Sequence, residues 1–379
     1  MNFDLTEEQE MVKKMVHEFA TKVVAPRARE IDRTCEFPRD VFRRAAELNL
    51  TGVAVPGEYG GGDLDTISYV IAIEEVSRYC GSSGVMLSVQ NSLVCDPVMN
   101  FGNEEQKQHF LKKLASGEWV GSFALTEPDA GSDAGRIRTR AEKTASGYRL
   151  TGNKIWVTNG IAADLFIVFA TIDPSRGSKG ITTFLVERDR PGMQVGKETE
   201  RLGICGSGSC EVVLDGCEIP ESNRLGKEGE GFKVAMRTLD GGRIGIAAQA
   251  VGLARAALEE ALLYSQQRKQ FDQPICEFQA IQWMLADMAT EIDAARLLTY
   301  KAAWTKDHQT RYSLEASVAK LVASDTAVRA TNKGIQIFGG YGYSKEYPME
   351  RFFRDSKVTE IYEGTSEIQK IVIASNILA

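Results

Sequence analysis

The chain is poor in histidine. Only three of its 379 residues are histidines, His17, His109 and His308, and they lie far apart in polar segments with a helical pattern. A histidine-based triad or metal centre needs such a residue beside other reactive groups. We therefore expect all three histidines at the surface and predict no chemistry built on them.

Cysteine pairs are also lacking. The seven cysteines are an odd number, and none forms a Cys-x-x-Cys pair. This pattern favours free thiols in a reducing compartment. Cys205, Cys210 and Cys217 lie close together, but their spacing fits no zinc motif, and residues 211–215 have the pattern of a strand. The sequence therefore predicts no metal site.

Excess positive charge and long apolar runs are missing as well. The net charge is −7 at pH 7, which argues against bulk attraction to nucleic acid or to an anionic membrane. No apolar run is long enough to span a bilayer, and the first residues lack the regions of a signal peptide. We expect a cytoplasmic protein with no nucleic-acid partner and no membrane insertion.

The two common nucleotide-binding loops are absent too. No Gly-x-Gly-x-x-Gly follows a predicted strand, and no Gly-x-x-x-x-Gly-Lys-Ser/Thr is present. A dinucleotide, if bound, must therefore lie between domains and not in a Rossmann fold.

Hydrophobic periodicity divides the chain into three regions. Residues 6–117 have a helical period, and Thr6 with Gln9 has the spacing of a capping box. From about residue 121 to 230 the apolar residues alternate between turn signals, which is typical of a small antiparallel β domain. The remainder is helical again.

Three long amphipathic segments, 244–268, 278–307 and 314–338, predict a helical bundle near the C-terminus. A last helix is expected to begin at Ser366, whose spacing to Gln369 suggests a second capping box. The fold class predicted is therefore α+β and multidomain. The predicted domains are an N-terminal helical domain (1–120), a middle antiparallel β domain (121–230) and a C-terminal four-helix bundle (231–379).

The segment Phe123–Asp133 joins a short apolar strand to a loop rich in hydroxyls, carboxylates and glycine. Such a loop can donate hydrogen bonds to the polar edge of a flavin or to a phosphate. It can equally be a turn that satisfies only itself.

Glu363 lies between Tyr362 and Gly364, just before the last predicted helix. The glycine lets a substrate approach the backbone, whose N–H groups can polarise a carbonyl. The carboxylate can then take a proton α to that carbonyl. A single loop glutamate is, however, more often simply solvated.

Two further segments are suggestive without being specific. Gln336–Tyr343 ends a predicted helix with glycines suited to a C-cap. Arg268, followed closely by Phe271, offers a cation and an aromatic ring to a pyrophosphate and a stacked base. Both patterns also occur in ordinary helix ends.

Taken together, these segments identify a resemblance. The chain resembles the acyl-CoA dehydrogenase family from Phe3 to Leu378, most closely its short-chain (butyryl-CoA) branch. The patterns that carry it are Phe123–Ser132, Trp156–Thr158, Gln336–Gly340 and Ile361–Gln369, in the family's order and without large insertions.

The resemblance implies an FAD enzyme that oxidises an acyl-CoA thioester to the trans-2-enoyl-CoA. Glu363 would be the catalytic base, while a hydride leaves the β carbon for flavin N5. Thr158 would lie near N5. The residues implied at the isoalloxazine are Phe123, Leu125, Thr126, Gly131, Ser132, Trp156, Val157 and Thr158.

The remaining implied contacts complete the FAD and substrate sites. Those implied for FAD, including the pyrophosphate and adenosine shared with a neighbouring subunit, are Arg268, Phe271, Gln279, Gln336, Ile337, Gly339, Gly340, Thr365 and Glu367. Those implied for the substrate are Ser132, Asp240, Arg243, Tyr362 and Gly364. FAD shared across subunits implies a homotetramer, and the family's usual electron acceptor is electron-transferring flavoprotein.

Substrate choice is less defined. Relatives that place the base on another helix do so at the position of Gly242, and glutaryl-CoA relatives carry an arginine at the position of Gly84. Both residues here favour a straight-chain, non-dicarboxylic substrate. Ser88, Gln90 and Asn91, in the helix expected to line the acyl pocket, either bond neighbouring backbone or the edges of FAD, or reach the acyl group. The second reading keeps an alicyclic substrate, of the cyclohexanecarboxyl-CoA type, as an alternative. A non-catalytic flavin- and CoA-binding relative is disfavoured by Glu363.

Overall fold

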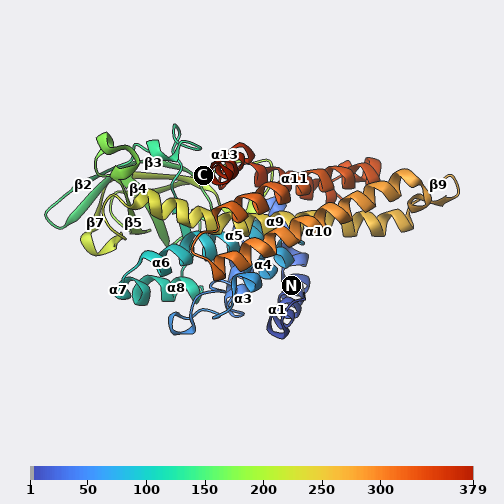
Figure 1. The fold of residues 1–379 in the computed structure, drawn as a ribbon, viewed down its shortest axis with the longest axis horizontal. Coiled ribbons are helices and arrows are strands. Elements are labelled where there is room, and N and C mark those ends of the chain that lie inside the picture. Colours follow the sequence, from blue (N-terminus) through green and yellow to red (C-terminus); the bar gives the residue numbers. More distant parts are fainter. Residues whose placement is uncertain (1–3, 379) are drawn as a thin grey trace.

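The structure, a computed structural model, describes residues 4–378. Residues 1–3 and 379, and with them the start of the resemblance at Phe3, lie outside the described part. Figure 1 shows a β domain at one end, a long helical bundle reaching to the other end, and a layer of shorter helices along one side.

The first part of the chain is helical because its apolar residues recur with a helical period. Thr6 caps the first helix with the predicted box: its Oγ1 accepts from Gln9 N at 3.2 Å, and Gln9 Oε1 accepts from Thr6 N at 3.0 Å. The helices are α1 (Glu7–Phe19), α2 (Ala28–Thr34), α3 (Arg39–Ala46), α4 (Thr66–Ser77), α5 (Gly81–Ser88), α6 (Asp96–Phe101), α7 (Glu104–Gln106) and α8 (Lys112–Ala115). Between α5 and α6 the chain continues as a wider π-helical segment, η4 (Val89–Cys95).

The middle region forms a single sheet. Its strands are β1 (Gly121–Ala124), β2 (Arg140–Lys143), β3 (Gly147–Val157), β4 (Leu165–Thr171), β5 (Ile181–Glu187), β6 (Met193–Glu198), β7 (Cys210–Pro220) and β8 (Arg224–Leu225). They follow the order β6-β7-β3-β2-β4-β5-β8, with β1 paired to β4. The prediction of a purely antiparallel sheet is wrong at two pairings, because β1 and β2 both run parallel to β4. Long connections, and not hairpins, join these strands to β4, which makes parallel pairing possible.

The last part of the chain begins with α9 (Gly231–Gln267), a helix of 37 residues. It packs against α10 (Gln279–His308) and α11 (Ser313–Phe338), and α13 (Ser366–Ile377) packs against α11. A short hairpin of β9 (Lys269–Gln270) and β10 (Gln273–Pro274) joins α9 to α10 at the far end of the bundle, and α12 (Met349–Lys357) precedes α13 (Figure 1).

One predicted helix start and one predicted cap need correction, while the last helix begins at Ser366 as predicted. The helix expected from residue 244 begins at Gly231, because Gly241 and Gly242 lie inside it without breaking it. The last helix is capped by Thr365, whose Oγ1 accepts from Ile368 N at 3.4 Å, so the capping box predicted at Ser366 is wrong. Within residues 4–378, no helix is long and apolar enough to cross a membrane.

Candidate active site

Glu363 lies in a tight turn between the short helix η12 (Val358–Glu360) and α13. Its φ is +55° and that of Gly364 is +96°, so two consecutive residues are in the left-handed region. Such a conformation is strained for a residue with a Cβ and costs about 1–3 kcal/mol. It persists only where surrounding contacts impose it, which marks this turn as one that the fold constrains.

Glu363 is half-buried, and one oxygen of its carboxylate is held away from water. Its Oε2 is enclosed and finds no hydrogen-bond donor among residues 4–378. Burial raises the pKa of Glu363 to about 8, although the positive charges of Lys320 and Arg243 act in the opposite direction. A carboxyl group with a pKa this near neutrality has the proton affinity that a general base requires.

Gly242 of α9 lies directly against this carboxylate. A Cβ added at Gly242 would meet Glu363 Oε2 at 2.0 Å and Leu93 Cδ2 at 2.7 Å. The two positions from which family members supply the base therefore face each other across one contact, and in this chain only position 363 carries a carboxylate.

Three side chains donate to the backbone carbonyls of the turn. Lys320 Nζ donates to Gly364 O at 2.8 Å, and Gln369 Nε2 donates to the same oxygen at 2.8 Å and to Glu363 O at 3.3 Å. Arg243 Nε lies 3.4 Å from Glu363 O. With its carbonyls held in this way, the turn is fixed in its left-handed conformation.

Asp240 and Arg243, which the resemblance implies at the substrate, form a buried pair with 2.8 Å between Arg243 Nη1 and Asp240 Oδ1. Arg243 is only 4% exposed. Burial raises the pKa of Asp240, while the hydroxyl of Ser313, which donates to it, lowers that pKa. The structure brings Arg243 to the Glu363 turn and leaves little of its surface open to a ligand.

A buried ion pair organises the loop after β1. Lys154 Nζ lies 2.7 Å from Glu127 Oε1, and it also donates to Leu125 O at 3.1 Å. Glu127 in turn accepts from the backbone N–H groups of Arg138, at 2.5 Å, and Thr139, at 3.0 Å. The start of the predicted loop is therefore tied to β3 through Lys154 and to residues 138 and 139 through Glu127, and it is not a free surface turn.

The residues expected at the isoalloxazine divide by exposure. Trp156 is 55% exposed and has a φ of +58°, at a bulge where the register of β3 against β7 shifts. The side chains of Leu125 and Val157 are buried in the core, so only their backbone atoms can face a ligand. Phe123, Thr126, Gly131, Ser132 and Thr158 retain exposed surface. An exposed indole beside accessible hydroxyls and backbone suits one face of a planar ring system.

The other group of expected FAD residues lies at the far end of the bundle. Arg268 follows the last residue of α9, and its guanidinium lies 5.7 Å from the ring centre of Tyr341. Phe271 is 88% exposed at the tip of the hairpin, and a Cβ at Gly339 or Gly340 would meet no atom within 4 Å. Gln279 and Gln336 are exposed, whereas the side chain of Ile337 is buried.

These two groups of expected FAD contacts lie far apart within the chain. Gly242, beside Glu363, and Arg268 are separated along α9 by a distance on the order of 40 Å at ~1.5 Å per residue. Figure 1 shows the hairpin at the opposite end of the molecule from the β domain that carries Trp156.

Of the three polar residues in the expected acyl-pocket helix, the two amides are bonded to backbone, whereas the Ser88 hydroxyl lies 3.0 Å from Tyr69 Oη. Asn91 accepts from Val53 N at 2.7 Å and donates to Leu50 O at 2.8 Å and Leu87 O at 2.9 Å. Gln90 donates to Leu114 O at 2.8 Å and accepts from Gly121 N at 2.7 Å. Of the two readings, the one in which these amides satisfy backbone is confirmed, and neither amide is free to meet an acyl group.

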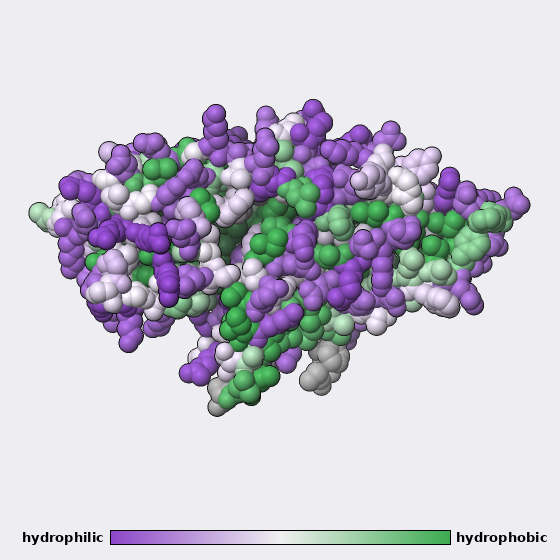
Figure 2. Space-filling model, turned by 90° about the horizontal axis from the view of Figure 1, so that it is seen from above, coloured by the Kyte–Doolittle hydropathy of each residue, from purple (hydrophilic) through white to green (hydrophobic). Residues whose placement is uncertain are grey.

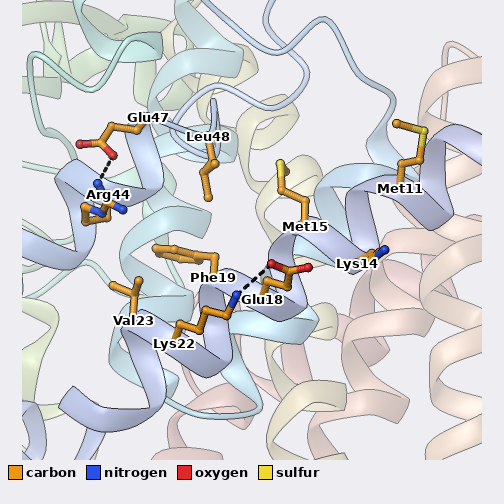
Figure 3. A pocket seen from close by; sticks show the side chains of 10 residues that line it. All are labelled: Met11, Lys14, Met15, Glu18, Phe19, Lys22, Val23, Arg44, Glu47 and Leu48. Carbon is orange, nitrogen blue, oxygen red and sulfur yellow. Dashed lines mark hydrogen bonds and ion pairs between the residues drawn. The ribbon is translucent and has the colours of Figure 1, made fainter.

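A hollow of about 560 Å³ lies elsewhere, between α1 and the end of α3 (Figure 3). Its lining residues are Met11, Lys14, Met15, Glu18, Phe19, Lys22, Val23, Arg44, Glu47 and Leu48. Lys22 pairs with Glu18, and Arg44 with Glu47. None of the predicted site residues lines it, so this hollow is separate from the Glu363 site.

The histidines and cysteines lie as the sequence predicts. The three histidines are exposed, and all seven cysteines are free thiols. Over the described range 4–378, no cluster of three potential ligands could hold a metal ion.

Sequence reasoning did not assign Lys154, Lys320, Gln249 and Gln369 to the site. These residues hydrogen-bond to the loop after β1, to the Glu363 turn or to Tyr362. Tyr362 donates to Gln249 Oε1, and this bond anchors the residue before the base. One signal was available: Lys320 follows Ala316 by four residues, and Ala323 follows Lys320 by three. Lys320 therefore lies on a helix face of small residues, where a lysine is unexpected.

Comparison with known proteins agrees with this geometry. Three family profiles match in order: the acyl-CoA dehydrogenase N-terminal domain at residues 6–118, the middle domain at 122–217 and the C-terminal domain at 229–378. The short-chain specific acyl-CoA dehydrogenase of Clostridium acetobutylicum is 48% identical over 377 residues, covering 100% of both chains.

Solved structures give the same result. Butyryl-CoA dehydrogenase from Megasphaera elsdenii matches with a TM-score of 0.98 and 46% identity over 100% of both chains. A chain solved in work on the electron transferring flavoprotein of Acidaminococcus fermentans and flavin-based electron bifurcation matches with a TM-score of 0.99 and 47% identity, again over 100% of both chains. The chain belongs to the acyl-CoA dehydrogenase family of FAD-dependent oxidoreductases.

Proposed function

We propose that the chain dehydrogenates a short-chain acyl-CoA to the trans-2-enoyl-CoA, with Glu363 as the base. The observation that carries this proposal is the enclosed, unpartnered Oε2 of Glu363 in a strained turn, with its pKa raised to about 8 by burial. The short-chain activity named for the relatives in Clostridium acetobutylicum and Megasphaera elsdenii supports the substrate class.

In the proposed reaction Glu363 takes the proton from the α carbon of the thioester. Bound FAD supplies the acceptor for the hydride that leaves the β carbon. The backbone N–H of Glu363 is proposed to donate to the thioester carbonyl, which stabilises the negative charge that develops on its oxygen. Lys320, Arg243 and Gln369 hold the carbonyls of the turn, so the orientation of this N–H is set by the fold.

The residues at two positions support a linear and uncharged acyl chain. At Gly84 an added Cβ would meet Ser77 Oγ at 2.0 Å, so the arginine that would pair with a distal carboxylate cannot be accommodated there without movement. A buried carboxylate without a partner is costly. Gln90 and Asn91 are bonded to backbone and the Ser88 hydroxyl lies 3.0 Å from Tyr69 Oη, which weakens the argument that favoured an alicyclic substrate.

Residue assignments beyond Glu363 are part of the same proposal. Tyr362, Gly364, Ser132, Asp240 and Arg243 are assigned to the substrate side. The FAD contacts are assigned as the sequence predicts, with backbone contacts only at Leu125, Val157 and Ile337, whose side chains are buried. The domain boundaries 1–120, 121–230 and 231–379 are likewise proposed.

We also propose a homotetramer in which FAD is shared between subunits. The separation of the two FAD-binding groups along α9 supports this, as do large exposed apolar side chains on the bundle, among them Leu262, Leu263, Trp283 and Trp304. Figure 2 shows apolar side chains gathered at the hairpin end of the bundle. Electron-transferring flavoprotein is the proposed electron acceptor, since a close structural match comes from work on that protein. A cytoplasmic location is proposed on the same family grounds.

The direct test is anaerobic flavin bleaching by purified protein with butyryl-, hexanoyl-, isobutyryl-, glutaryl- and cyclohexanecarboxyl-CoA. Butyryl-CoA is expected to bleach fastest. Glu363→Gln should retain FAD and bind ligand while losing most of the bleaching rate, because the amide keeps the shape and removes the base. Glu346→Gln, at an exposed glutamate in the loop before α12, is the matched control and should behave as wild type. A Glu363→Gln enzyme with near wild-type rate would sink the assignment of the base.

A further inference from the structure

We propose that Lys320 is a positioning residue for Glu363: its buried ammonium group fixes the turn that carries the base and stabilises the ionised form of the base. The proposal rests on the proposed role of Glu363. It assigns a function to a residue of α11 that lies outside every motif carrying the family resemblance.

The first observation is where Lys320 lies. It is 0% exposed, on the face of α11 that also buries Ala316, Ala319, Ala323 and Ala327. From that face its Nζ reaches Gly364 O at 2.8 Å, immediately after the base. A long cationic side chain among alanines therefore ends directly beneath the left-handed turn.

The second observation is what Lys320 lacks. Two other lysines with enclosed ammonium groups each have a carboxylate partner: Lys154 pairs with Glu127 at 2.7 Å and Lys306 with Asp96 at 2.8 Å. Lys320 forms no such ion pair with any carboxylate in the described range 4–378. A buried cation without a close counterion is costly, and a neutral residue of similar size would fold more favourably there.

The charge that Lys320 faces is that of Glu363. Burial lowers the pKa of Lys320 to about 8, and the strongest opposing influence is the Glu363 carboxylate, which raises it. In return, Lys320 is the strongest of the charges that lower the pKa of Glu363. The catalytic carboxylate therefore serves as the distant counterion of Lys320.

Other charged and titratable groups surround this pair. Arg243 and Asp240 face it from α9, Asp325 lies further along α11, and Glu360 and Tyr362 lie on the segment of the turn itself. Tyr69 of α4 is close enough for the charge of Glu363 to act on it. Arg243 has the same sign as Lys320, so loss of Lys320 removes part, not all, of the positive potential at the base.

Gln369 separates the mechanical role from the electrostatic one. It donates to the same Gly364 oxygen at 2.8 Å but carries no charge. Removing Gln369 loosens the turn without changing the field at Glu363. Removing the ammonium of Lys320 does both.

The experiment compares Lys320→Met with Gln369→Leu in the FAD-loaded enzyme, by the pH dependence of kcat/KM for butyryl-CoA. Glu363 acts only when ionised, so activity appears as pH rises through its pKa. Loss of the cation raises that pKa, and the acid limb should move to higher pH by about one unit. Gln369→Leu should lower kcat and leave the acid limb in place. Lys320→Gln, which is neutral but keeps a donor, should show the same shift as Lys320→Met.

A second readout needs no turnover. At pH 8, binding of a non-oxidisable thioether analogue of butyryl-CoA should draw protons into the wild-type site, because the raised pKa of Glu363 rises further when the ligand desolvates it. Calorimetry in two buffers measures this uptake, which should be much smaller in Lys320→Met, where the base is already protonated. An unmoved acid limb and an unchanged proton uptake in both Lys320 variants overturn the proposal. A fully active Glu363→Gln enzyme overturns the proposed function instead, so the two failures are distinguishable.

Discussion

Replacing Gly242 with alanine is expected to separate stability from activity in this enzyme. In the middle of a helix, glycine to alanine ordinarily stabilises by about 1 kcal/mol. At Gly242, however, the new methyl group would lie 2.0 Å from Glu363 Oε2 and 2.7 Å from Leu93 Cδ2. Relieving such overpacking costs about 1–3 kcal/mol. We therefore expect a net loss of stability of about 0–2 kcal/mol, combining the same two magnitudes.

The effect on catalysis should be larger. Cβ atoms essentially never approach a neighbour more closely than 3.0 Å, so the carboxylate of Glu363 must move by about 1 Å. A displacement of about 1 Å in a catalytic group can lower the rate about 100-fold, equivalent to about 2.7 kcal/mol of transition-state stabilisation. FAD binding should be unchanged, since the new methyl group on α9 would meet Glu363 and Leu93 and none of the residues assigned to FAD.

The neighbouring residue provides the control. A Cβ at Gly241 would meet Lys306 Nζ at 3.5 Å and Tyr312 Oη at 3.7 Å, which are ordinary contacts. Gly241→Ala should therefore raise the melting temperature and retain most of the bleaching rate. Anaerobic stopped-flow reduction by butyryl-CoA and thermal unfolding of the two variants measure the contrast. Equal rates for Gly242→Ala and wild type would refute the packing argument and, with it, the placement of the Glu363 carboxylate.

Three further outcomes are expected. The folded-state pKa of Glu363, about 8, lies above its usual value of 4.5, so its ionisation destabilises the fold as pH rises between these values. Glu363→Gln should therefore melt at a higher temperature than wild type at pH 9 but not at pH 4. Equal melting temperatures at pH 9 would contradict the burial of this carboxylate. Arg268→Ala should release FAD more readily and shift the mass in solution below a tetramer, as measured by flavin absorbance and light scattering; an FAD-saturated tetramer would count against the shared site. Asn91→Ala leaves Val53 N and two carbonyls without their buried partner, so it should lower the unfolding free energy by about 2–3 kcal/mol in denaturant titration. The order of acyl-CoA preference should not change. A changed order would restore the interpretation in which Asn91 reaches the acyl group.

Sequence alone predicted the elements whose pattern is local. The helices at 278–307 and 314–338 were expected almost at their observed limits, because periodicity and turn residues lie within the segments themselves. The start of α9 was missed by thirteen residues, since Gly241 and Gly242 indicate a break when read locally. The need for glycine at position 242 comes from another part of the chain, because Gly242 makes room for Glu363.

The site was predicted in the same uneven way. Glu363 could be named because its neighbours form a recognisable pattern. Lys320 could not, because its partner Gly364 is 44 residues away and only the fold brings them together. Asn91 was ambiguous for a related reason: an amide in an apolar helix indicates a buried hydrogen bond but not which group accepts it. The parallel pairing of β1 with β4 likewise depends on a long connection that periodicity does not describe.

The distance along α9 between the base and Arg268 has a genetic consequence. In the proposed assembly each complete centre draws its base from one polypeptide and its hairpin from another. A chain altered at Glu363 and a chain altered at Arg268, each defective alone, would therefore restore one intact centre when they assemble together, and leave another with both defects. Complementation between the two alleles would then show that each centre takes its base and its hairpin from different subunits. The phenotype of either allele alone would not show this.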